Sequence, residues 1–149
     1  METIQKVYIK NKPTTAQNIG RFLLGSFLAY TGIGHLTFLK KEFLAQVPSW
    51  LPVEPDTVVL LSGAAEIGLG LSLLLASKQR KKVGWATAAF FVAIFPGNIA
   101  QLVEHKDAFG LNSDTARWLR LPMQPALIAL ALWSTGAWQS WRKNRGIAQ

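Results

Sequence analysis

The 149-residue sequence contains no cysteine, only two histidines and few charged side chains. The absence of cysteine excludes disulfides, a thiolate nucleophile and cysteine-ligated zinc or iron–sulfur sites held by this chain alone. His35 and His105 lack the spacing of a metal-binding pair, and the sequence has no phosphate loop, dinucleotide fingerprint or serine elbow. These absences weigh against a self-sufficient enzyme with a metal or other evident cofactor, so redox chemistry would belong to a bound cofactor or a partner.

The charges of the chain are mostly basic. Lys and Arg number 16 against 8 Asp and Glu, which gives a formal net charge of +8. In a soluble protein this excess would suggest nucleic-acid binding. Here the basic residues cluster at the ends of apolar runs, as at 78–82 and 142–145. This pattern is typical of membrane topology, so we expect membrane lipid and not nucleic acid as a partner.

Four apolar segments are each long enough to cross roughly 30 Å of hydrocarbon as an α-helix. They cover residues 19–39, 57–77, 83–103 and 122–141. The alternative is a soluble four-helix bundle. A soluble bundle helix, however, has a polar face, and residues 83–103 show none. The sequence therefore predicts an all-α integral membrane four-helix bundle.

The four segments divide the chain into an N-terminal tail at 1–18, a helical domain at 19–141 and a basic C-terminal tail at 142–149. Segments on the side of the two termini contain 11 Lys and Arg residues, and the opposite loops contain 5. The positive-inside rule then places both termini in the cytoplasm. The N-terminal tail does not resemble a cleaved signal peptide, so we expect an uncleaved anchor in a bacterial plasma (inner) membrane.

The two loops on the outer side, 40–56 and 104–121, are amphipathic. The first contains three prolines, which prevent one continuous helix and suit a segment lying at the membrane interface. Trp50 and Trp118 mark the same headgroup level. We therefore expect both loops to cover the outer end of the bundle.

Polar side chains inside apolar spans are costly and need a partner or a function. Glu66 lies about nine residues into the second span, so it is about 14 Å deep. Ser62 shares its helix face. Asn98 and Gln101 share a stripe of the third span, and further polar residues lie near the outer ends of the first and fourth. The sequence thus predicts an outward-facing polar pocket. The candidate ligand-binding residues are His35, Ser62, Glu66, Asn98, Gln101, Arg117, Arg120 and Gln124.

Each candidate has a structural alternative. Glu66 is the candidate proton acceptor, since a buried carboxyl group can exchange a proton with a ligand. Asn98 and Gln101 are also typical of hydrogen bonds between membrane helices. Arg117 and Arg120 would share a face of a short helix and gather an anion at the pocket mouth, or bind lipid phosphates instead.

Small residues and a proline indicate how the spans pack. The inner half of the bundle is expected to contain almost no polar side chain, and Pro96 to free a backbone carbonyl for polar partners. The glycines predicted to let helix backbones approach are Gly25, Gly32, Gly63, Gly68 and Gly70.

Five short motifs occur in order along residues 20–140. They are Gly-Ile-Gly-His at 32–35, Val-Pro-Ser-Trp-Leu-Pro at 47–52, Ser62-Gly63 followed by Glu66, Phe-Pro-Gly-Asn-Ile at 95–99 and Trp-Leu-Arg-Leu-Pro-Met-Gln at 118–124. In this arrangement the sequence resembles the DoxX family of small four-helix membrane proteins. The resemblance implies a four-helix fold. Its members include subunits associated with thiosulfate:quinone oxidoreductase, and distant relatives act as chaperones or cargo receptors.

Two functions are therefore expected. The first is a redox-associated accessory subunit that binds a quinone or a small acid in the outward-facing pocket, with Glu66 accepting a proton, Asn98 and Gln101 donating hydrogen bonds, and a membrane or redox protein as partner. The alternative is a non-enzymatic membrane chaperone or scaffold that binds other membrane proteins or lipid.

The excess of basic residues on one side generates a topology prediction. A reporter fused after Gln149 is expected to be active only in the cytoplasm, and one inserted near Pro55 only outside, because Lys and Arg are retained on the cytoplasmic side. Paired cytoplasmic and periplasmic reporters at the two positions measure this. The opposite pattern would contradict the outward-facing pocket as well.

Overall fold

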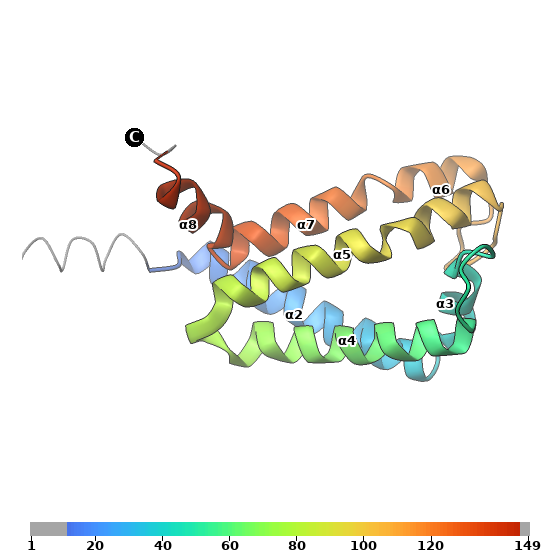
Figure 1. Cartoon of the computed structure of the whole chain (residues 1–149), viewed down its shortest axis with the longest axis horizontal. Helices are drawn as coiled ribbons and strands as arrows, with labels where there is room; N and C mark the ends of the chain where they lie inside the picture. Colours follow the sequence, from blue (N-terminus) through green and yellow to red (C-terminus); the bar gives the residue numbers. More distant parts are fainter. Residues whose placement is uncertain (1–11, 147–149) are drawn as a thin grey trace, which may run out of the picture.

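The computed structural model describes residues 12–146, and this part of the chain is all-α without a strand. The tails predicted at 1–18 and 142–149 fall partly outside the described residues. The helices are α2 (Thr15–Leu36), α3 (Lys40–Gln46), α4 (Pro55–Leu75), the 3₁₀ turn η1 (Ser77–Gln79), α5 (Arg80–Val103), α6 (Asp114–Arg120), α7 (Met123–Ser134) and α8 (Ala137–Asn144). The long helices run lengthwise, with α3 and α6 at one end and α8 at the other (Figure 1).

Local sequence signals explain where the long helices begin. Thr14 and Gln17 form a capping box in which each side chain bonds the other residue's backbone N–H, so α2 begins four residues before the predicted span. Pro55 occupies the first turn of α4, where its missing N–H costs nothing.

The fourth predicted span, 122–141, is not one helix. α7 ends at Ser134, and Gly136 has a left-handed φ of 72°, after which α8 begins. Glycine adopts this conformation without steric cost and ends the helix there. At its other end, α7 nearly continues α6, because Leu121 and Pro122 both keep right-handed helical dihedrals. The fourth long element therefore begins and ends earlier than the sequence predicts.

The described helices include fewer clear membrane spans than the four predicted. α4 and the η1–α5 segment are each long and apolar enough to cross a membrane. α2 qualifies only together with α3, from which it is bent by 93°. α7 alone has 12 residues, which extend only about 18 Å. By length and composition, two or three helices of residues 12–146 could therefore span a membrane.

α2 packs on α4 through glycines whose backbones nearly touch. A Cβ added at Gly32 would lie 2.8 Å from the carbonyl oxygen of Gly63, and one added at Gly70 would lie 2.7 Å from that of Gly25. Gly68 differs, because a Cβ there meets nothing within 4 Å. Four of the five predicted glycines thus form this contact.

The two helix pairs, α2–α4 and α5–α7, pack together near α8 and separate toward α3 (Figure 1). The core at the closed end contains Leu24, Leu28, Leu73, Phe91 and Ala131.

The expectation that the inner half has almost no polar side chain is wrong. Arg21, Thr87, Ser134 and Thr135 are buried at this end. The Arg21 guanidinium donates to the Leu73 carbonyl, and both threonines donate to carbonyls of their own helices. The two threonine bonds are local and satisfy the hydroxyl groups at little cost, whereas Arg21 Nε and Ser134 Oγ are buried without a hydrogen-bond partner among the described residues.

The α2–α4 contact generates a prediction with a matched control. Gly32→Ala is expected to lower the free energy of unfolding by about 1–3 kcal/mol, because the new methyl group overlaps backbone atoms that cannot move aside. Gly68→Ala is expected to be neutral or slightly stabilising, since alanine favours the helix. Thermal unfolding in detergent measures both, and equal melting temperatures for the two variants would contradict the packing contact.

Candidate functional site

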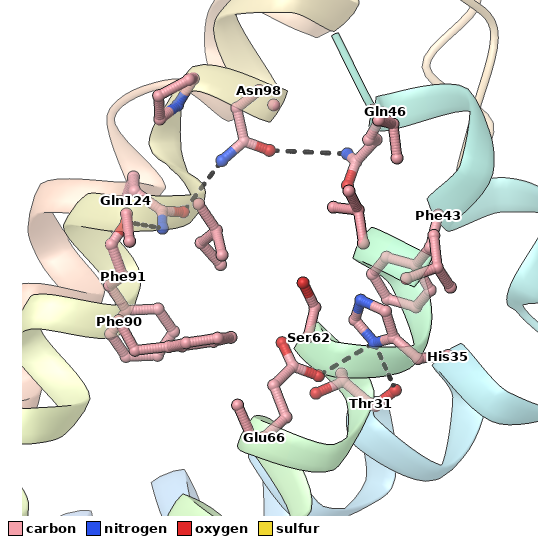
Figure 2. A pocket seen from close by; sticks show the side chains of 18 of the residues that line it. Thr31, His35, Phe43, Gln46, Ser62, Glu66, Phe90, Phe91, Asn98 and Gln124 are labelled. Atoms are coloured by element: carbon pink, nitrogen blue, oxygen red, sulfur yellow. Dashed lines mark hydrogen bonds and ion pairs between the residues drawn. The ribbon is translucent and has the colours of Figure 1, made fainter. Parts of the chain in front are cut away.

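A cavity of about 800 Å³ lies between the two helix pairs, beneath α3. This volume falls within the roughly 300–1,000 Å³ of small-molecule sites. Most of the lining is apolar, including Phe27, Phe90, Ile94 and Leu127. Its polar side chains come from both walls and face one another across the cavity (Figure 2). The predicted site residues that line it are His35, Ser62, Glu66, Asn98, Arg120 and Gln124.

The α2–α4 wall presents a histidine–carboxylate pair. His35 Nδ1 lies 3.0 Å from Glu66 Oε2 and 3.0 Å from the Thr31 carbonyl oxygen. Because a carbonyl oxygen can only accept, Nδ1–H donates to Thr31, and the buried Oε2 receives no directed hydrogen bond. Alternatively, a protonated Glu66 can donate to Nδ1. The two arrangements differ in which nitrogen of His35 carries the ring proton and in whether Glu66 carries a proton.

The His35 ring is held rigidly. It stacks on Phe43 of α3 with ring centroids 3.3 Å apart and planes 14° from parallel. Gly63 makes room for it, since a Cβ at Gly63 would lie 2.7 Å from His35 Cβ. With Nδ1 committed to Thr31 and Glu66, the other ring nitrogen lies on the cavity side (Figure 2). Ser62 Oγ points into the same space (Figure 2).

The opposite wall carries a chain of amides. Gln46 Nε2 donates to Gln101 Oε1 at 2.8 Å and approaches Asn98 Oδ1 at 3.5 Å. Asn98 Nδ2 donates to Gln124 Oε1 at 3.0 Å, and Gln124 Nε2 donates to the Phe91 carbonyl at 2.7 Å. These bonds join α3, α5 and α7, so the amides hold the helices in register.

Two features predicted for α5, the position of Gln101 and the effect of Pro96, differ from the structure. Gln101 does not line the cavity, because its Nε2 donates to the Ala108 carbonyl and its Oε1 accepts from Gln46. Gln124 donates to the carbonyl of Phe91, which is not the carbonyl that Pro96 leaves without its helical N–H partner, since that carbonyl belongs to Val92, four residues before the proline. Gln101 therefore supports the wall from behind.

The two predicted arginines of α6 have different surroundings. Arg117 is buried between Asp107 and Asp114 and also donates to the Lys106 carbonyl. It does not line the cavity, because this pairing holds it in the 105–114 turn. Arg120 does line the cavity, and its Nη1 is buried without a hydrogen-bond partner. Burial lowers the pKa of the Arg120 guanidinium.

Two residues of α3 that complete the site were missed by sequence reasoning. Gln46 bridges to the amide chain, and Phe43 covers His35. Both lie in the predicted interfacial loop, where an isolated glutamine and phenylalanine carry no distinguishing pattern. Only the 93° bend between α2 and α3 turns them back over the cavity.

A partly exposed cluster of Ser49, Glu104 and Lys106 connects the loop after α3 to the end of α5, beside the cavity. Ser49 donates from its backbone N and its Oγ to Glu104 Oε1, at 3.1 and 2.8 Å. Lys106 Nζ lies 2.6 Å from Glu104 Oε2 and donates to the Val47 carbonyl at 2.9 Å. The Lys106 and Ser49 hydrogen bonds lower the pKa of Glu104 from 4.5 to about 2. The loop after α3 is thereby tied to the end of α5.

The arrangement permits hydrogen bonding and proton exchange with a ligand. Ser62 Oγ, the free His35 nitrogen and the Glu66 carboxyl group meet at one wall. Within residues 12–146, no group of three His, Asp or Glu side chains is placed to hold a metal ion.

The family to which the chain belongs is the domain of unknown function DUF8561, whose family model matches residues 24–135. The predicted membership of the DoxX family is therefore wrong. No curated protein and no solved structure matches the chain. The DoxX activities consequently give no support for a function, which has to be argued from the cavity itself.

The Glu104 cluster generates a pH prediction. The folded-state pKa of about 2 lies below the ordinary value of 4.5, so Glu104 stabilises the fold above pH 4.5 and this contribution is lost as the pH falls from 4.5 to 2. Glu104→Gln is therefore expected to melt below the wild type at pH 7 and level with it near pH 2.

Glu54→Gln is the control, since Glu54 is exposed and makes no capping hydrogen bond. Melting temperatures from pH 2 to 7 measure both variants. A Glu104→Gln difference that does not change with pH would contradict the assignment.

Proposed function

We propose that this member of the DUF8561 family is an integral membrane protein that binds one amphipathic small molecule in its cavity. The observation that carries the proposal is the composition of the lining, in which an apolar volume of about 800 Å³ has hydrogen-bonding groups on two facing walls. An apolar body fits the aromatic and aliphatic lining. A compact polar head fits the groups of the α2–α4 wall.

The polar head would contact His35, Ser62 and Glu66. The Ser62 hydroxyl can donate to a carbonyl oxygen, and Glu66 can accept from a hydroxyl group. A quinone head group and a small acid both offer such atoms. The donors proposed from the sequence, Asn98 and Gln101, have a lesser part, because each already donates within the wall.

The proposed orientation places the α3–α6 end of the molecule at the outer membrane surface. Trp50 and Trp118 at this end are 67% and 63% exposed, which suits side chains at the headgroup level. α3 lies nearly at right angles to α2, as an interfacial helix would. In this orientation the cavity is reached from the outer side. With a quinone as ligand, a redox protein in the membrane would supply or remove the electrons.

The His35–Glu66 pair gives the proposed ligand a proton partner. Transfer of one proton between Glu66 and the ligand changes the charge of the pair while Phe43, Gly63 and Thr31 keep the ring in place. A preorganised acid–base pair of this kind exchanges protons without rearranging the site.

The proposal predicts a small molecule that stays with the purified protein. Mass spectrometry of organic extracts is expected to find it in the wild type and in Ser72→Phe, and to find it reduced at least about tenfold in Ser62→Phe. Both serines lie on α4, but only Ser62 lines the cavity, where a phenyl group would occupy the ligand volume.

A second variant tests the proton. Glu66→Gln keeps the shape of the side chain and is expected to fold and retain the ligand, while the pH dependence of retention disappears.

If Ser62→Phe retains as much ligand as Ser72→Phe, the cavity is not the binding site.

A further inference from the structure

Arg120 lines the cavity without a counterion. Its guanidinium makes no hydrogen bond or ion pair with the described residues, and its Nη1 is shielded from solvent. Arg120 as a whole is half-buried, but this shielded N–H group is costly to leave without a hydrogen-bond acceptor. Arg117, three residues earlier, differs from Arg120, because Asp107 and Asp114 neutralise its charge.

No acidic side chain within residues 12–146 pairs with Arg120. Glu66 faces His35, and Glu54 is exposed at the start of α4. The other acidic side chains of the described chain each have a partner: Glu42 accepts from Phe109 N, Asp56 pairs with Lys40, Glu104 with Lys106, and Asp107 and Asp114 with Arg117. No acidic side chain of residues 12–146 thus supplies an anion to Arg120, and a bound molecule can supply it.

Arg120 faces the cavity and not the surrounding lipid. The exposed side of α6 is formed by Trp118 and Leu119, which are 63% and 71% exposed. α6 packs on α5 and α7, so Arg120 belongs to the wall opposite His35 and Glu66. An arginine that anchors lipid phosphates would be on the exposed side instead.

We propose that Arg120 binds the acidic group, a carboxylate or a phosphate, of an amphipathic acid whose apolar body fills the cavity. The inference rests on the proposed function, in which the cavity binds one amphipathic molecule, and changes one part of it: the ligand is an acid and not a neutral quinone, and its acidic group lies at Arg120 and not at the α2–α4 wall. The planar guanidinium offers paired N–H donors that match two oxygens of either group. Glu66 lies on the opposite wall, so its carboxyl group does not occupy the same position.

Three probes distinguish the charge of the ligand and its source. Dodecanoate is a free acid, 1-dodecanol is its neutral counterpart, and dioleoyl phosphatidic acid carries the phosphate on a lipid. Binding is measured by thermal shift and calorimetry on the full chain in non-ionic detergent. The variants are Arg120→Gln, Arg120→Lys and the control Lys41→Gln, which removes one exposed positive charge on α3.

The wild type is expected to bind at least one acid about tenfold more tightly than dodecanol. Arg120→Gln loses about tenfold for that acid and less than about twofold for dodecanol, whereas Lys41→Gln changes neither. Arg120→Lys keeps the charge and is expected to retain part of the affinity. If Arg120→Gln weakens the binding of dodecanoate but not of phosphatidic acid, the ligand is a free acid. If it weakens the binding of phosphatidic acid but not of dodecanoate, the ligand is a lipid with an acidic head group.

Two outcomes would overturn the inference. If the wild type binds dodecanol as tightly as both acids, the cavity binds amphipaths without selecting charge, and the proposed function stands without an anion site. This comparison needs no variant, so it holds even if Arg120→Gln does not fold. If none of the three probes binds, the proposed function fails together with the inference.

Discussion

The backbone contact between α2 and α4 determines where the polar groups of the cavity lie. Gly32 and Gly63 bring the two helices close enough for His35 to pass over Gly63. Glu66, three residues beyond Gly63, then reaches His35 Nδ1 at 3.0 Å. A side chain at Gly63 would displace the histidine and separate the pair. The same glycines that permit close packing therefore also preorganise the acid–base pair, and stability and site geometry depend on one contact.

The two walls of the cavity have different roles because their hydrogen bonds are distributed differently. On the α5–α7 side, the amides of Asn98, Gln101 and Gln124 each donate within the protein, which keeps α3, α5 and α7 in register. On the α2–α4 side, Ser62 Oγ and one nitrogen of His35 face the cavity and bond no described residue. The amides thus have a structural role, while the α2–α4 wall keeps polar atoms that a ligand could bind.

The sequence predicts the all-α class because apolar runs of about 20 residues allow few other structures. It predicts helix ends less well, since they depend on single residues such as Thr14 and Gly136. The polar residues of long helices are found by helical spacing. Gln46 is missed because it reaches the cavity only through the α2–α3 bend.

Two further findings could not be predicted from the sequence: the ion pairs of Arg117 and the family of the chain. Arg117 is paired by Asp107, which the 105–114 turn brings back to α6, so the spacing of the two arginines alone does not separate their roles. The motifs that resemble DoxX combine glycine, proline and histidine in apolar helices and in the loop at 47–52. Helix packing in membranes favours such small residues generally, so these motifs do not distinguish one family from another.

A cavity in an apolar bundle selects among ligands through its polar groups. It does so because a polar group left without a hydrogen-bond partner costs free energy, which a ligand that pairs with it avoids. Hydrocarbon alone could fill the apolar part of the lining, but it would leave Arg120 Nη1 and Glu66 Oε2 without hydrogen-bond partners. Water alone could solvate these groups, but it would wet the aromatic lining of Phe90 and Phe91. A molecule with an apolar body and a polar, acidic group satisfies both requirements. Because Arg120 and Glu66 lie on facing walls, the two ends of the cavity would not be equivalent for such a molecule.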